Sequence, residues 1–165
     1  MKQTTPRPFL PPRWFIRAAW AVHRAIYRVT GGRRGLGPPT PKTYGTLRIH
    51  TIGRRSGAAR TAILGYFEDG PNLFTLAMNG WGEPEPAWWL NLQAQPEATI
   101  DLKDGSREIR ARPAIGDERA RLWDEMRRRE PNLDAYAERR HRETAVVVFE
   151  PRAGDAPTTP RDEQT

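Results

Sequence analysis

The chain of 165 residues contains no cysteine and only three histidines, and no Asp or Glu precedes Glu68. The absence of cysteine excludes disulfides, thiolate metal sites and cysteine nucleophiles. His23, His50 and His141 are far apart and lack the spacing of metal ligands, so we expect no metal site. No apolar run approaches the roughly 20 residues that cross a bilayer, and arginines interrupt the apolar stretch near the N-terminus. These features argue against a secretory signal and favour a cytoplasmic or membrane-surface protein.

Positive charge is concentrated at the start of the chain. Residues 1–67 carry thirteen basic side chains and no acid, a charge of +13, whereas residues 68–165 carry fourteen basic and twenty acidic side chains, a charge of −6. All but three of the 27 basic residues are arginine. This asymmetry suggests an anionic partner for the N-terminal part, such as a phosphate, a lipid headgroup or a nucleic acid. A GC-rich genome would give the same preference for arginine over lysine.

Composition and hydrophobic pattern predict one folded domain with accessory segments at both ends. From N- to C-terminus we expect a Pro-rich extended tail (1–12), an amphipathic helix (13–30), a Gly/Pro linker (31–43), the folded domain (44–151) and a disordered tail (152–165). A chain of this length can bury a core in a single domain.

Within the folded domain, the patterns predict mostly short strands. Alternating or continuous apolar stretches predict strands at 47–51, 61–67, 73–78, 98–102, 107–114 and 144–150. Helical patterns appear at 87–95, at 118–129 with Asp117 as its cap, and at 131–141. Most connections are too short for parallel crossovers. We therefore expect a mainly β (α+β) fold, a small antiparallel barrel with peripheral helices.

The stretch GRRSGAAR at residues 53–60 is a candidate anion-binding turn. Its glycines permit a tight turn whose backbone N–H groups converge on an anion, a nest. Its arginines offer bidentate forks to oxyanions. It is not a Walker A loop, since that motif's spacing and lysine are absent. The pattern alone slightly favours an ordinary hairpin turn with solvated arginines.

The stretch AWWLNL at residues 87–92 places two tryptophans side by side on a predicted helix. Adjacent helical side chains point about 100° apart, so one indole can be core while the other lines a cleft. Asn91 lies three residues after Trp88 and can share its face. Spacing alone favours two core tryptophans and a capping amide.

Several motifs in a fixed order resemble the deazaflavin (coenzyme F420)-dependent nitroreductase family. They read LxIxTxGRRSGxxRT, LFTLAMNGW, PAWWLNLQAQPEATI, a late YAERR and VVVFEP, and they span about residues 44–151. The resemblance implies a split β-barrel. It also implies an F420-dependent reductase, in which reduced F420 donates a hydride to a quinone, a nitroaromatic compound or an activated alkene.

The resemblance also implies site residues. It places part of the basic turn around the phosphate or the polyanionic tail of F420, namely Arg54, Arg55, Ser56 and Arg60. A second set of residues is placed beside the ring or along the cofactor groove. These are Ile63, Gly65, Ala77, Met78, Asn79, Trp88 and Asn91. Tyr136 matches a tyrosine that closes the substrate site, where it would position the acceptor or donate a proton. A packing tyrosine on a late helix, with solvent as the proton source, is an equal interpretation.

Four departures from the family pattern bear on the activity. Relatives often carry Ser-Lys-Gly where this chain has Met78, Asn79 and Gly80, so a hydroxyl and a cation are missing beside the ring. Glu130 and Leu133 stand where nitroimidazole-reducing members carry tyrosines, which argues against nitroimidazoles as acceptors. A non-catalytic F420 carrier or sensor therefore stays open, as does FMN in place of F420, because related split barrels bind flavin phosphates.

The predicted N-terminal helix suggests a second anionic partner. At 100° per residue one stripe of the helix carries Arg13, Arg17, Arg24 and Arg28, opposite an apolar face. Such a helix is typical of anionic lipid surfaces, where each arginine contributes about 1 kcal/mol. We expect peripheral binding to the inner face of the cell membrane, with packing on the barrel as the alternative. A nucleic-acid-binding module is a weaker hypothesis, because no recognised motif is present and the barrel portion is acidic.

Overall fold

The computed structural model describes residues 35–41 and 43–152. In chain order the elements are β1 (Gly45–Ile52), β2 (Ala59–Asp69), β3 (Asn72–Leu76), α2 (Ala87–Ala94), β4 (Glu97–Leu102), β5 (Gly105–Pro113), α3 (Gly116–Arg129), α4 (Leu133–Ala137) and β6 (Val146–Pro151). The predicted tail 1–12 and helix 13–30 lie outside the described residues, as do residues 31–34 and 42 of the linker and nearly all of the C-terminal tail. No helix in the described part is long and apolar enough to cross a membrane.

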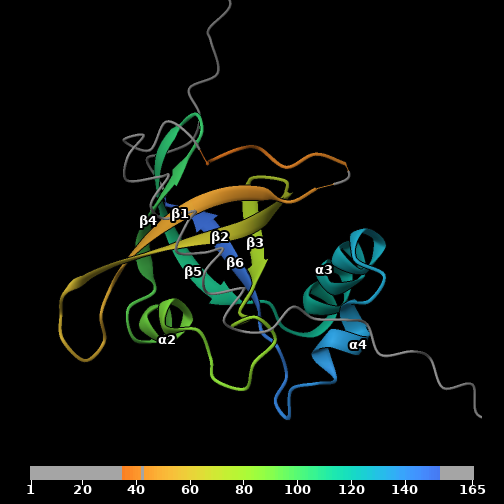
Figure 1. Ribbon diagram of the computed structural model, residues 1–165. Helices are drawn as coiled ribbons and strands as arrows, with labels where there is room; N and C mark the ends of the chain where they lie inside the picture. Colours follow the sequence, from red (N-terminus) through yellow and green to blue (C-terminus); the bar gives the residue numbers. More distant parts are fainter. Residues whose placement is uncertain (1–34, 42, 153–165) are drawn as a thin grey trace, which may run out of the picture.

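The strands form a closed antiparallel barrel in the order β1-β2-β3-β6-β5-β4 (Figure 1). β1 and β2 form a long hairpin that pairs from Gly45 and Tyr66 to Ile52 and Ala59. The last strand, β6, lies between β3 and β5 and pairs with both. The predicted fold class, a mainly β barrel with peripheral helices, is confirmed.

Side-chain alternation explains how the barrel is filled. On β1, Leu47 and Ile49 are completely buried, whereas Arg48 and His50 on the opposite face are partly exposed. The interior of a small barrel is packed with side chains rather than left open. Trp88, which α2 contributes, joins this interior cluster.

β3 and β6 are buried on both faces. Their alternate residues Leu73 and Phe149 point into the barrel, whereas Phe74 and Val148 belong to a second apolar cluster with α3 and α4. A strand covered on both faces reads as a continuous apolar run, which accounts for the LFTLAM and VVVF stretches. The two helices lie beside these strands, on the right of Figure 1, away from the β1–β2 turn.

Several predicted boundaries are wrong. β3 ends at Leu76 rather than at residue 78, because the N–H of Met78 bonds back to the carbonyl of Leu76 at 2.9 Å and the chain turns there. α3 begins at Gly116, so Asp117 lies in its first turn and does not cap it. The negative charge of Asp117 in the first turn still stabilises the helix, because it interacts favourably with the helix dipole. α4 covers only Leu133–Ala137, shorter than the helix expected over 131–141.

Candidate functional site

The turn between β1 and β2 projects past the end of the barrel (Figure 1). Its backbone is closed on itself: the N–H of Gly53 donates to the carbonyl of Ala58 at 2.8 Å, and the N–H groups of Ser56 and Gly57 both donate to the carbonyl of Gly53. Gly57 has φ of 66°, a value that glycine adopts without strain. Because most N–H groups of the turn are engaged, the candidate backbone nest is not formed, and the backbone is that of the hairpin turn which the pattern slightly favoured. Any anion that binds at this turn would therefore be held mainly by side chains.

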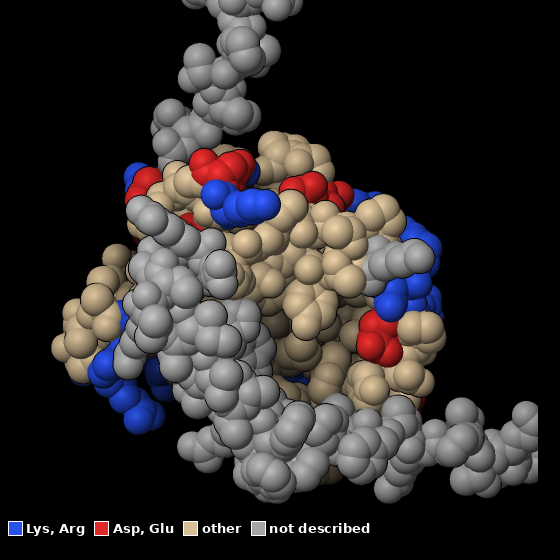
Figure 2. Space-filling view, turned by 45° about the horizontal axis from the view of Figure 1, so that its top comes forward, with Lys and Arg blue, Asp and Glu red and all other residues tan. Residues whose placement is uncertain are grey.

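The side chains of the turn supply uncompensated positive charge. Arg54, Arg55 and Arg60 are exposed, and none of them forms an ion pair with an acid in the part of the chain that the structure describes. In Figure 2, basic atoms without acidic neighbours mark the lobe that projects on the left of the view. Three exposed guanidinium groups on one turn suit a ligand with several negative charges.

Asn91 connects this turn to α2. The side chain is buried, with 4% of its surface exposed. Its Oδ1 accepts a hydrogen bond from the N–H of Arg54 at 3.2 Å, and its Nδ2 donates to Thr51 Oγ1 at 3.1 Å. The Asn91 side chain, on α2, therefore holds the start of the basic turn in place. Its predicted direct contact with the cofactor stays a prediction.

The two tryptophans of α2 both lie in the core. Trp88 is 8% exposed and Trp89 is 4% exposed. The Trp88 ring meets Phe149 edge to face, with centroids 6.4 Å apart. The expectation from spacing alone, two core tryptophans, is therefore confirmed, and the alternative with one indole in an open cleft is wrong. The predicted role of Trp88 beside the cofactor stays untested.

The outward face of β2 carries Ile63 and Gly65, which alternate with the inward Leu64. A side-chain carbon built on Gly65 would come within 2.8 Å of the Tyr44 ring, so this glycine allows Tyr44 to lie across the strand. The Thr75 hydroxyl donates to the carbonyl of Gly65 at 2.6 Å. Packing against Tyr44 is thus one reason for a glycine at residue 65. That Gly65 also lines the cofactor groove stays a prediction.

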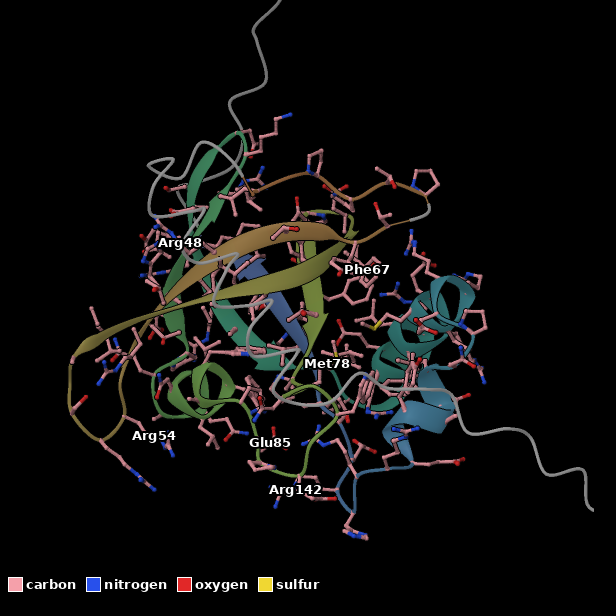
Figure 3. The ribbon with its side chains drawn as sticks, in the orientation of Figure 1. Arg48, Arg54, Phe67, Met78, Glu85 and Arg142 are labelled. Atoms are coloured by element: carbon pink, nitrogen blue, oxygen red, sulfur yellow. The ribbon has the colours of Figure 1, made fainter. Side chains whose placement is uncertain are left out.

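The segment after β3 carries the next group of predicted site residues. Ala77 is fully buried, whereas Met78 and Asn79 are exposed. Figure 3 shows Met78 near the end of β3, on the other side of α2 from Arg54 in this view. The predicted site residues are thus distributed over the basic turn, this segment, β2 with Ile63 and Gly65, α2 with Trp88 and Asn91, and α4 with Tyr136.

Tyr136, on α4, lies against an aromatic residue that the sequence analysis did not assign. Its ring stacks on Trp81, with centroids 5.6 Å apart and the ring planes 27° apart. The guanidinium of Arg139, in the turn that follows this helix, lies 5.9 Å from the Tyr136 centroid. Trp123 Nε1 donates to Asp134 Oδ1 at 2.7 Å and so attaches α4 to α3. The structure thus joins Tyr136 to the segment that carries Met78 and Asn79.

Arg140 is the main residue that the sequence analysis missed. Its side chain is fully buried and donates to the carbonyl of Ala77 at 3.0 Å, to Thr144 Oγ1 at 2.9 Å and to Glu85 Oε1 at 3.1 Å. It therefore connects the two ends of the segment from Ala77 to Glu85. The YAERR motif contains this arginine, but no spacing rule distinguishes it from the exposed Arg139 beside it.

A separate charge cluster lies on the outer face of β1 and β4. Asp101 accepts hydrogen bonds from Arg48, His50 and Ser106, at 2.8 Å or less. Burial alone would raise the pKa of Asp101, but these hydrogen bonds together lower the pKa to about 2. The carboxylate is therefore held ionised, and its surroundings indicate a structural role.

Comparison with known proteins identifies the chain. Residues 20–151 match the family model of the F420H(2)-dependent quinone reductases. The chain belongs to this family. F420H(2)-dependent quinone reductases from two strains of Mycobacterium tuberculosis, CDC 1551 / Oshkosh and ATCC 25618 / H37Rv, are each 32% identical to it over 131 residues, which is 78% of this chain and 87% of the relative.

A solved structure supports the fold. The structure of an F420-H2 dependent reductase (FDR-A) superposes with a TM-score of 0.57 at 24% identity, covering 64% of this chain and 93% of the other. The F420-dependent family expected from the motifs is thus confirmed, although the matching family model is that of quinone reductases and not of nitroreductases. The protein is an F420-dependent reductase with reduced F420 as its hydride donor, and nothing in the comparisons supports FMN.

Proposed function

We propose that the enzyme reduces a quinone and that the basic turn holds the anionic tail of F420. The observation that carries the second part is the set of exposed arginines at residues 54, 55 and 60, which have no acidic partner in the described part of the chain. Exposed charge without a partner is available to a ligand, and a polyanion gains from every guanidinium it meets. The family membership supplies the matching cofactor.

Two parts of the protein would serve the cofactor and the acceptor. Asn91 positions the turn through the N–H of Arg54, so the arginines start from a fixed point. When bound, F420 in its reduced form supplies a hydride, and one further proton completes the reduction of a quinone to a hydroquinone. The partly exposed Tyr136 can donate a hydrogen bond to the acceptor oxygen, where negative charge develops as the hydride arrives. Either this hydroxyl or solvent supplies the proton.

Nitroaromatic compounds and activated alkenes are further acceptors in the proposal. Both develop negative charge on an oxygen as they accept a hydride, so the same donor would serve them. A cytoplasmic enzyme bound to the inner face of the membrane would meet quinones directly. That location depends on the arginine stripe of residues 13–30, which lie outside the described residues. Co-sedimentation of the full chain, but not of a variant lacking residues 1–40, with anionic liposomes at low salt tests it.

A carrier or sensor that binds F420 without turnover is the second candidate. Met78 and Asn79 favour it, because they supply neither the hydroxyl nor the cation that relatives often have beside the ring.

One experiment separates the two candidates. The full chain is titrated with F420, following the fluorescence of the cofactor, and oxidation of reduced F420 is then measured with a naphthoquinone and with a nitroaromatic compound. We expect binding at micromolar concentrations and faster oxidation with the quinone. Binding without oxidation by any acceptor would favour the carrier, and absence of binding would overturn the proposal.

A further inference from the structure

Trp81 adopts a backbone conformation that bulky residues rarely take. Its φ is 59°, Gly80 before it has φ of 58°, and the N–H of Gly82 donates to the carbonyl of Asn79 at 3.0 Å. Positive φ at both central residues is the pattern of a type I′ turn, and such positions normally hold Gly, Asn or Asp. Among the described residues other than glycine, only Trp81 has a positive φ. Backbone stability alone would favour glycine at this position, so the strained conformation points to a task for the indole.

The strained turn places the indole against Tyr136. The two rings are stacked, with their centroids 5.6 Å apart, and both side chains are partly exposed. Trp81 also packs against the apolar cluster that contains Phe74, Leu122 and Leu133. The pair therefore has one side supported by the core and some aromatic surface left open to solvent.

The position of the two rings is fixed by the chain segment that follows Tyr136. Arg140 donates to the carbonyl of Ala77 and to Glu85 Oε1, and the N–H of His141 donates to Glu83 Oε1 at 2.7 Å. These contacts attach the segment that carries Trp81 at both of its ends, and Figure 3 shows Met78 and Glu85 along that segment. The aromatic pair is thus formed before any ligand binds, which lowers the entropic cost of binding one.

We propose that Trp81 and Tyr136 form an aromatic platform for the acceptor ring, and that Trp81 makes the enzyme prefer fused bicyclic quinones to single-ring quinones. The inference rests on the proposed quinone reductase activity and names its substrate class. Two fused rings cover more of an indole than one ring does. A stacked contact between two aromatic rings raises affinity roughly 2- to 10-fold. The reaction itself is unchanged: the quinone gains a hydride from reduced F420 and a proton, giving the hydroquinone and oxidised F420.

The test compares a bicyclic quinone, menadione, with a single-ring quinone, duroquinone. For the full chain and its Trp81→Phe and Trp81→Gly variants, kcat and KM are measured for both acceptors. We expect the ratio of kcat/KM, menadione over duroquinone, to fall about fivefold in Trp81→Gly and less in Trp81→Phe. The change should come through KM for menadione, with kcat and F420 affinity altered by less than about twofold.

Two further measurements separate recognition from packing. Phe67→Leu is the matched control, because Phe67 is also a partly buried aromatic residue that packs against the same apolar cluster, and it should leave the acceptor ratio unchanged. Equilibrium dialysis of oxidised menadione with the cofactor-free protein should show weaker binding by Trp81→Gly, which supports the platform without any turnover.

The outcomes distinguish this inference from the function on which it rests. An unchanged ratio in both Trp81 variants, or an equal fall in Phe67→Leu, would overturn the role of Trp81 but would not affect the proposed quinone reduction. Absence of F420 binding, or of quinone reduction by the unaltered chain, would overturn both. If Trp81→Gly does not fold, the acceptor ratio and the dialysis measurement are both taken from Trp81→Phe, and they decide the question.

Discussion

Arginines occupy two contrasting settings in this enzyme. Arg140 is buried and donates to Glu85, to Thr144 and to the carbonyl of Ala77. Arg54 and Arg60 lie on an exposed turn and form no ion pair with any acid in residues 35–41 and 43–152. The same side chain thus serves as a structural connector in one place and as available charge in the other. An arginine with acidic partners stabilises the fold, whereas one without them can bind a ligand.

The largest expected effect is on stability, at the connector. Arg140→Met removes hydrogen bonds from both ends of the segment 77–85 and leaves the partly buried Glu85 with only its longer ion pair to Arg142, at 4.0 Å. We expect the free energy of unfolding to fall by about 3–5 kcal/mol, measured by urea denaturation.

A second substitution serves as the control for this prediction. Combining Arg140→Met with Glu85→Leu also removes the Glu85 carboxylate, so the double variant should recover part of the lost stability. A loss below about 1 kcal/mol in the single variant, typical of exposed pairs, would show that Arg140 does not differ from the surface arginines.

The second prediction concerns the stability contributed by another paired arginine, Arg48. Its partner Asp101 has a pKa of about 2, below the ordinary 3.8. A carboxylate with a lowered pKa in the folded state stabilises the protein above its unfolded pKa, and this contribution is lost as the pH falls toward the folded pKa. Asp101→Asn should therefore cost about 2 kcal/mol near neutral pH.

The pH dependence provides the check on Asp101. The stability difference between Asp101→Asn and the unaltered protein should be constant above about pH 5 and shrink toward about pH 2, as followed by urea denaturation at several pH values. A difference that does not change with pH would mean that the carboxylate charge is irrelevant.

The third prediction concerns the unpaired set. Arg54→Ala and Arg60→Ala should each weaken F420 binding about tenfold, which is about 1.4 kcal/mol, and should reduce its dependence on salt concentration. Stability should change little, because neither side chain has an acidic partner among the described residues. Fluorescence titration at two salt concentrations measures the effect.

Arg121 offers the matched control for this titration. It is an exposed arginine that pairs with Asp69 through contacts of 2.7 and 2.8 Å, on α3 and away from the basic turn. Arg121→Ala should leave the affinity for F420 unchanged. Equal weakening by all three variants would mean that net charge, and not the turn, attracts the cofactor.

The smallest effect separates the shape of the turn from its charge. Gly57 has φ of 66° with open space around its α-carbon, so Gly57→Ala costs backbone strain without a clash. We expect a loss of about 1 kcal/mol in stability. Because all three arginines remain, F420 affinity should stay within about twofold. A larger loss of affinity, with stability intact, would show that the conformation of the turn also matters.

Much of the fold follows from local patterns. The alternation around Leu47 and Ile49 predicts β1, and the apolar runs predict β3 and β6, because each pattern reports which faces of one strand are buried. The insertion of β6 between β3 and β5 depends on pairing between distant segments, which no local pattern encodes. The absence of a side-chain cap on α3 is equally invisible, because Asp117 is a good cap by type and lies two residues too late.

The candidate site divides in the same way. The basic turn could be predicted, because its arginines and glycines are contiguous. Arg140 and Glu85 are 55 positions apart, so only the folded chain shows that they meet. Trp81 lies between two glycines and reads as ordinary loop, and its strained backbone and its contact with Tyr136 appear only in three dimensions.

The place of β6 in the barrel has a consequence for biosynthesis. β3 and β5 have no strand between them until residues 146–151 are present, so nascent chains that end earlier carry two unpaired strand edges. The barrel closes only when the last strand has left the ribosome. Ribosome stalling or premature termination before Val146 would therefore release an aggregation-prone sheet instead of a shortened enzyme.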